Sequence, residues 1–321
     1  MSSTMDNLTL SRNLESLRRY AGSDLLAALS DPNTCEIMLN HDGKLWCERF
    51  GEPMQVIGTM TPSKAETFMR QVTSCLDKEL TRESPQVDGE LLLDGSRFSG
   101  VFPPVVSAPC FAIRKKASRV FLLSDYVEAG TLSSSQYDFL CDAIGRRRNI
   151  LVVGGTGSGK TTLLNGLIAE MVRQDSNQRF FVIEDTGEIQ CKAPNAVLFH
   201  TTSTVSMTDC LKQALRFRPD RILVGEVRDH AALDMLDAWN TGHEGGAATL
   251  HANSARLALS RVRGLVSRNP YAPKAIEEVI GEAVHLIVFI TKTPQGRKVK
   301  ELLEVRGYDH HSGEYDLKPV G

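Results

Sequence analysis

The sequence predicts an α/β fold in two domains, and three observations support this. Apolar runs with strand-like composition alternate with stretches of helical periodicity through the second half of the chain. A glycine-rich loop lies between one of these apolar runs and a helical stretch. The first half instead carries paired strand patterns around Asp-Gly turns, which are typical of hairpins. We therefore expect a small α/β domain followed by a domain built on a parallel sheet.

The first domain is predicted from its turn and capping residues. Asp-Gly pairs at residues 42–43 and 94–95 each separate two strand-like runs, and Thr61-Pro62 has the pattern of a helix N-cap and first turn. We place the link to the second domain within residues 117–135, which gives domains 1–130 and 131–321. The expected elements are a hairpin of residues 36–39 and 44–48, a helix from 61 to about 80, a hairpin of 90–93 and 97–102, and a strand at 110–114.

The second domain is predicted to contain a mostly parallel sheet covered on both faces. Its apolar runs are continuous rather than alternating, as in strands that are buried on both sides. The end of the chain, residues 298–305 and 307–317, resembles a hairpin at the edge of this sheet. The expected core strands are 150–153, 180–183, 197–199, 222–224, 247–250 and 284–290.

The glycine-rich loop after residues 150–153 has the pattern of a P-loop. Its glycines let backbone N–H groups turn toward one point, and the following helix adds its positive N-terminal end, so a polyphosphate is the expected ligand. Lys160 supplies a charge for the β- and γ-phosphates, and Thr161 supplies a hydroxyl for Mg²⁺. The expected nucleotide-binding residues are Gly155, Thr156, Gly157, Ser158, Gly159, Lys160, Thr161 and Thr162.

Composition narrows the class of protein. The 321 residues are 41% hydrophobic and 24% charged, which suits a protein folded throughout. Lys and Arg number 37 against 39 Asp and Glu, so the chain lacks the basic field of a dedicated nucleic-acid binder. The seven cysteines are scattered and include no C-x-x-C pair, which argues against a disulfide framework and a zinc site.

Targeting signals are also missing from the pattern of the sequence. The N-terminal segment lacks the basic-then-apolar layout of a secretory signal, and the longest apolar runs fall well short of about 18 residues. We expect a cytoplasmic protein with reduced thiols, whose association with a membrane is peripheral.

Carboxylates follow two of the expected strands. Because ligands of open parallel sheets bind beyond the carboxyl ends of the strands, Glu184 and Glu188 are candidates for assisting a metal or orienting a nucleophile. Glu226 is the candidate for polarising the attacking water, since Gly225 stands where many P-loop proteins carry a metal-assisting Asp. Metal binding is expected from Thr161, Glu184 and Glu226. The alternatives are a solvated acidic loop and a carboxylate at a helix start.

Two histidines flank the expected strand 247–250. His243 and His251 do not form an H-E-x-x-H motif, because residue 247 is Ala, so they fit sensing of the γ-phosphate or of a neighbouring subunit better than zinc binding. We expect His251 to take part in catalysis. Any of the clustered arginines could serve as an arginine finger across a subunit boundary, although the default role of a surface arginine is solvated pairing with carboxylates. They are residues 146–148, 216, 218 and 221, Arg228, Arg256, Arg261 and Arg263.

Four ordered motifs, GGTGSGKTT, VIEDTGEI, RILVGEVRD and TGHEGGAATLHAN, resemble those of the secretion (traffic) ATPase superfamily. The short first domain and the string LHANS are similar to its type IV secretion and conjugation branch. The resemblance implies a homo-hexameric ATPase with ATP and Mg²⁺ as cofactors, a PAS-like N-terminal domain and a RecA-like ATPase domain. It also implies that Arg97 and Arg114 reach the phosphates. Expected partners are inner-membrane components of a secretion or conjugation apparatus.

Three other functions remain open from the residues alone. A RecA-like nucleic-acid-stimulated motor or recombinase shares the same core, although the near-neutral charge speaks against it, and no direct sequence-specific nucleic-acid binding is expected. A GTP switch lacks an N-K-x-D guanine-reading sequence. A scaffold that binds ATP would release no phosphate.

Overall fold

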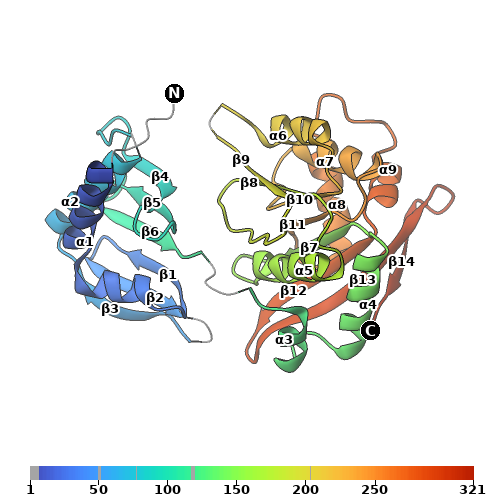
Figure 1. Ribbon diagram of the computed structural model, residues 1–321, viewed down its shortest axis with the longest axis horizontal. Coiled ribbons are helices and arrows are strands. Elements are labelled where there is room, and N and C mark those ends of the chain that lie inside the picture. The colour runs from blue at the N-terminus through green and yellow to red at the C-terminus, as the bar shows by residue number, and fades with distance from the viewer. Residues whose placement is uncertain (1–6, 50–51, 77, 117–119, 203) are drawn as a thin grey trace. The chain divides into compact units, whose positions relative to one another are not determined.

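The computed structural model describes residues 7–49, 52–76, 78–116, 120–202 and 204–321, and the chain divides into two compact units, Met1–Ser118 and Arg119–Gly321 (Figure 1). The division falls after residue 118 rather than after the expected residue 130. The reason is that helix α3 (Leu123–Glu128) buries Leu123 and Tyr126 in the core of the second unit. Residues 117–119 of the expected link lie outside the described residues.

The first unit is an antiparallel sheet with two helices packed against it. Leu17 and Leu25 of α1 and Phe68 of α2 share one core with the inward-facing residues of the sheet, such as Ile37 and Phe98. The strand order is β3-β2-β1-β6-β5-β4. The elements are α1 (Asn7–Ser30), β1 (Thr34–Leu39), β2 (Lys44–Arg49), β3 (Gln55–Thr59), α2 (Pro62–Cys75), β4 (Gln86–Glu90), β5 (Arg97–Val101) and β6 (Cys110–Arg114).

The sequence predicts part of this unit correctly. The hairpin of β1 and β2 is confirmed, and Thr61 caps α2 by accepting a hydrogen bond from the Lys64 N–H. The predicted second hairpin is wrong in its first strand, because β5 pairs with residues 86–90 and not with 90–93. Leu91 is apolar because it is buried in the core at the start of a wide turn, where its N–H donates to the Ser96 carbonyl at 2.7 Å. Helix α1 has no counterpart in the sequence analysis, and α2 ends before residue 80.

The second unit is an eight-stranded sheet between two layers of helices. Its order is β14-β13-β12-β7-β11-β10-β8-β9, and the neighbours from β12 to β9 are all parallel, as predicted. The strands are β7 (Ile150–Gly154), β8 (Phe180–Glu184), β9 (Ala196–His200), β10 (Arg221–Val224), β11 (Ala247–His251), β12 (Leu286–Thr293), β13 (Gly296–Asp309) and β14 (Glu314–Pro319). The further helices are α4 (Ser134–Gly145), α5 (Lys160–Gln174), α6 (Met207–Ala214), η1 (Leu215–Phe217), α7 (Ala231–Asn240), α8 (Ala255–Val266) and α9 (Ile276–Ala283).

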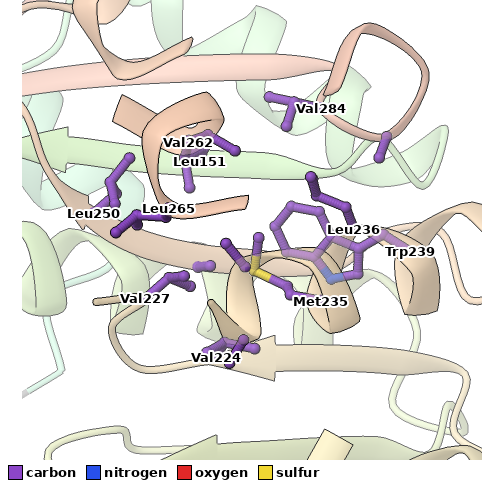
Figure 2. Close-up of a cluster of buried hydrophobic side chains, with 14 of the residues drawn as sticks. Leu151, Val224, Val227, Met235, Leu236, Trp239, Leu250, Val262, Leu265 and Val284 are labelled. Carbon is purple, nitrogen blue, oxygen red and sulfur yellow. The ribbon is translucent and has the colours of Figure 1, made fainter. Parts of the chain in front are cut away.

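Alternate residues of each core strand face different helical layers. Ile150 and Val152 belong to the core formed with α3, α4 and α5, whereas Leu151 and Val153 belong to the core formed with α6 to α9. Figure 2 shows the second core, where Trp239 of α7 lies among aliphatic side chains of strands and helices. The Trp239 indole N–H is satisfied there by the Ile222 carbonyl at 3.1 Å. Burial on both faces explains why the strands are continuously apolar.

The C-terminal hairpin differs from the prediction. Strand β13 continues through Gly307, and the turn to β14 lies at residues 310–313. The register shifts between Val305 and Gly307, so the glycine marks a bulge within the strand rather than its end. No helix in the described ranges is long and apolar enough to cross a bilayer.

Candidate functional site

The strand order gathers the candidate residues at one edge of the parallel sheet. β11 lies directly beside the P-loop strand β7, and His251 pairs in register with Gly154. β10 and then β8 follow, so the loops that carry Glu226 and Asp185 come next along the same edge. Residues that are up to 97 positions apart in the sequence therefore line the carboxyl ends of neighbouring strands, where ligands of such sheets bind.

The P-loop lies between β7 and α5. Gly159, the residue before the helix, has φ 94°, in the left-handed region that favours glycine. The first N–H groups of α5 lack acceptors within the helix and lie at its positive end. Ser158 is 2% exposed, and its hydroxyl has no hydrogen-bond partner in the part of the chain that the structure describes. A buried hydroxyl without a partner, next to the unpaired N–H groups at the start of α5, fits a site that binds a phosphate or the metal ion that accompanies it.

Lys160 extends along this loop toward β11. Its Nζ donates to the Gly155 carbonyl at 2.9 Å and lies 3.3 Å from His251 Nε2 and 3.5 Å from Nδ1. The residue is 7% exposed, which is unusual for a lysine. The structure thus brings the predicted phosphate-binding lysine and the predicted sensor histidine into contact.

A chain of polar contacts continues from His251 away from the P-loop. Its Nε2 lies 3.3 Å from Glu226 Oε1, and Glu226 Oε2 accepts from Arg228 at 2.8 Å. Arg228 also reaches Asp185 Oδ2 at 3.4 Å, and Asp185 accepts from the Thr201 hydroxyl at 2.7 Å. These polar contacts follow the strand order from β7 to β9. A change in the contacts of Lys160 could therefore be transmitted from residue to residue along this edge of the sheet.

The electrostatics of Glu226 favour its carboxylate form. Burial by itself raises the pKa of Glu226, but the hydrogen bond and charge of Arg228, together with the charges of His251 and Lys160, outweigh burial. The net pKa lies below its ordinary value. Glu226 is therefore an ionised hydrogen-bond acceptor over the physiological pH range, able to orient a water molecule but weak as a base.

The structure explains why glycine occupies position 225. A Cβ on Gly225 would lie 2.8 Å from the Cβ of Glu184 on the neighbouring strand β8. An aspartate at this position would force the two strands to shift. The absence of the Asp that many P-loop proteins carry is thus a consequence of how closely β8 and β10 approach at Glu184.

Glu184 itself is engaged in shaping the loop that follows it. The residue is 2% exposed, and its Oε2 accepts from the N–H groups of Glu188 at 2.6 Å and Ile189 at 3.0 Å. Burial raises its pKa, against the lowering effect of these two hydrogen bonds. Its Oε1 has no partner among the described residues. Glu188, in contrast, is half-buried and uses its backbone for these contacts.

A magnesium ion bound at this edge would need phosphate oxygens and water to complete its coordination. Within the described ranges no three His, Cys, Asp or Glu residues cluster as a metal cage would require. Mg²⁺ in nucleotide sites is commonly held by few protein ligands together with phosphate oxygens and water. The unsatisfied oxygens of Ser158 and Glu184 and the hydroxyl of Thr161 agree with such a site, and the assignment of Thr161, Glu184 and Glu226 stays a prediction.

Arg297 also contacts the P-loop, although no motif in the sequence points to it. It pairs with Lys292 beside the turn between β12 and β13, and its guanidinium donates to the Gly157 carbonyl of the P-loop at 3.3 Å. A Cβ on Gly159 would lie 2.9 Å from Arg297 Cδ. In the sequence Arg297 is an arginine beside a hairpin turn. It indicates a contact with the P-loop only when β12 is known to lie beside β7.

Other predicted residues lie elsewhere. His243 precedes β11, so it belongs to the opposite edge of the sheet, where its Nδ1 lies 2.9 Å from the Pro219 carbonyl. Arg147 contacts the carbonyls of Glu244 and Asp220 at that edge. In the first unit, Arg97 of β5 and Arg114 of β6 are direct cross-strand partners, which places both side chains on one face of that sheet. Their contact with phosphates stays a prediction.

Comparison with known proteins gives consistent relatives. The family described as type II/IV secretion system proteins matches residues 94–304. The conjugal transfer protein TrbB of Rhizobium radiobacter is 46% identical over 306 residues, which are 95% of this chain and 94% of that protein. The VirB11 ATPase of the Brucella suis type IV secretion system, solved with sulphate, aligns at 25% identity with a TM-score of 0.50, covering 93% of this chain and 97% of that one. The Legionella pneumophila ATPase DotB aligns at 19% identity with a TM-score of 0.63 over 93% of this chain and 80% of that one, and shares the fold.

Proposed function

We infer the function from the family to which the chain belongs, that of the type II/IV secretion system proteins. We propose that the chain is an Mg²⁺-dependent ATPase that energises a conjugal transfer or type IV secretion apparatus. We further propose that it works as a homo-hexamer at the cytoplasmic face of the inner membrane, bound to membrane components of that apparatus. The TrbB relative supports conjugal transfer, and the VirB11 relative supports both ATP hydrolysis and type IV secretion.

The contact of Lys160 with His251, and of His251 with Glu226, is the observation that supports hydrolysis most directly. A nucleotide-binding scaffold needs the P-loop alone. Here His251 lies 3.3 Å from the P-loop lysine, and the ionised carboxylate of Glu226 lies 3.3 Å from His251. The three side chains come from residues at or after the carboxyl ends of β7, β11 and β10, which are neighbours in the sheet. Such a row can register the γ-phosphate and orient a water beside it.

In the proposed reaction the P-loop amides and Lys160 bind the phosphates and fix the γ-phosphoryl group. Mg²⁺, when bound through Thr161 with Glu184 or Glu226 nearby, would neutralise charge that develops on the phosphate oxygens. Glu226 and Glu188 orient the attacking water through hydrogen bonds. Because transition states of phosphoryl transfer are loose, positioning and charge stabilisation contribute more than a strong base does.

Loss of the γ-phosphate would change the contacts of Lys160, and His251 would pass this change to the Glu226–Arg228 pair. Arg228 joins that pair to Asp185 in the loop after β8. We propose that this row couples hydrolysis to movement, with Arg97 and Arg114 of the N-terminal domain contributing positive charge to the nucleotide.

The experiment is to measure phosphate release from Mg-ATP and, in parallel, the mass of the purified protein with and without ATP. We expect Mg²⁺-dependent release, loss of release in K160A, and a hexamer in one or both conditions. Binding of ATP with no release in the presence of Mg²⁺ would reduce the protein to a scaffold. Release that rises steeply with added single-stranded DNA and falls with salt would instead favour a nucleic-acid motor.

A further inference from the structure

Asn165 lies on the P-loop helix α5, one turn beyond Thr161, and is 2% exposed. Its Nδ2 donates to the Glu188 carbonyl at 3.1 Å, and its Oδ1 accepts from the Gln190 N–H at 2.9 Å. Asparagine is a poor residue for the interior of a helix, and a buried amide is costly unless it is hydrogen-bonded. The side chain is therefore retained for its two contacts with the loop after β8.

The same loop is held from its other side by Glu184. The Glu184 carboxylate accepts from the N–H groups of Glu188 and Ile189, at 2.6 Å and 3.0 Å. Four hydrogen bonds from two buried side chains thus converge on residues 188–190. Glu188 is fixed at both ends of its backbone, because its N–H points to Glu184 and its carbonyl to Asn165. Ile189 adds an anchor, since its side chain is buried in the core beside α5.

We propose that Asn165 is a positioning residue that sets the place of the Glu188 carboxylate relative to the P-loop. The helix that begins with Lys160 and Thr161 also carries Asn165, so one rigid element positions both the phosphate-binding groups and the loop that presents Glu188. This inference rests on the proposed ATPase function and on the role of Glu188 in orienting water.

The geometry also explains why asparagine suits the position. The contact with Gln190 requires an acceptor and the contact with Glu188 requires a donor, and an asparagine amide supplies both. Aspartate has nearly the same shape but offers only acceptors when ionised, so it would face the Glu188 carbonyl with a like partial charge. A loop displaced by about 1 Å from a reacting centre can lose about 10²-fold in rate.

The test compares kcat and KM for phosphate release in N165A, N165D, E188Q and the double variant N165A/E188Q. We expect N165A and N165D to lower kcat by about 10- to 100-fold. The KM for ATP should stay within about twofold of wild type, because the phosphate-binding loop is unchanged. The decisive result is the double variant: if Asn165 acts through Glu188, N165A should lower the residual kcat of E188Q little or not at all.

Two outcomes would overturn the inference. N165A could lower the kcat of E188Q by the same factor as it lowers that of wild type, or it could lower the melting temperature with kcat intact. Asn240 provides the matched control, since it is an exposed asparagine of α7 that donates to Glu282, and N240A should match wild type in kcat. If N165A does not fold, N165D and N165S serve in the same cycle, with ATP titration as the test of folding.

The design also separates this inference from the proposed function. If E188Q has the kcat of wild type, Glu188 takes no part in turnover and the positioning role of Asn165 is overturned. The ATPase assignment would still stand in that case, provided that K160A loses phosphate release. Phosphate release that survives K160A would contradict the ATPase assignment itself.

Discussion

The two edges of the parallel sheet contain the same kinds of polar residue and use them differently. At the amino edge, Asn149 is fully buried: its Oδ1 accepts from the N–H groups of Gly245 and Gly246, and its Nδ2 donates to the Ala283 carbonyl. At the carboxyl edge, His251, Glu226 and Arg228 are partly exposed and contact one another. Asn149, which binds backbone groups, holds the fold together, whereas His251, Glu226 and Arg228, which contact each other beside the P-loop, are available to a ligand.

His243 and His251 illustrate this difference at the two ends of one strand, β11. His243 lies before β11 and contacts the Pro219 carbonyl, while His251 ends β11 between Lys160 and Glu226. In the sequence the two residues cannot be told apart, because both are histidines beside one predicted strand. The identity of the partner, a backbone carbonyl or two charged side chains, is what distinguishes a structural histidine from a candidate sensor.

The largest expected effect is at the carboxyl edge. The substitution E226Q should lower kcat for phosphate release by about 10²- to 10⁴-fold, because it removes the charged acceptor that orients the water. ATP affinity, measured by calorimetric titration, should change little. The matched control is E244Q, which alters an exposed glutamate at the amino edge and should keep wild-type kcat. Retained activity in E226Q would move the water-orienting role to Glu188.

The amino edge should respond in stability rather than activity. N149A leaves three backbone groups without their partners, and we expect a loss of about 2–4 kcal/mol in the free energy of unfolding. Urea denaturation measures this loss, and kcat per folded molecule should stay near wild type. A fall in kcat with unchanged stability would mean that the amino edge takes part in the reaction.

The two histidines give a smaller and more direct comparison. H251A should lower kcat by about 10- to 100-fold, which corresponds to about 1.4–2.7 kcal/mol in the activation free energy. H243A should leave kcat unchanged and lower stability by about 1 kcal/mol, the typical value of one hydrogen bond. Steady-state kinetics and thermal unfolding of both variants would separate the roles, and equal effects on kcat would remove the distinction between the edges.

The smallest expected effect is the pH dependence of the stability that Glu184 contributes. Burial raises its pKa above the ordinary 4.5 despite two backbone hydrogen bonds, so the folded state holds this proton more tightly than the unfolded state does. The stability contributed by the protonated form is complete below the unfolded pKa and is lost as pH rises through the folded pKa. E184Q keeps an acceptor oxygen and does not titrate. Its melting temperature relative to wild type should therefore increase from acidic to neutral pH, and a decrease over that range would contradict the burial argument.

The local pattern of the sequence predicts the parts of the site that lie close together in the chain. The strand, loop and helix around Lys160 need only a glycine-rich run between two periodic segments, and the ends of the apolar strands point to Glu226 and His251. Strand order and register depend on contacts between distant segments. For that reason only the structure reveals three contacts of the site. They are the approach of Glu184 to Gly225, the hydrogen bond of Arg297 to Gly157 and the hydrogen bond of Asn165 to Glu188.

The most direct test of the difference between the two edges is amide hydrogen exchange of the E226Q variant with and without Mg-ATP. Nucleotide should slow exchange in peptides that contain residues 154–165, 184–190 and 225–229, at the carboxyl edge. Peptides that contain residues 147–149, 219–221 and 243–246, at the amino edge, should exchange at unchanged rates. Protection confined to the amino edge, or no protection of the P-loop at saturating ATP, would contradict the assignment of the carboxyl edge as the ATP site.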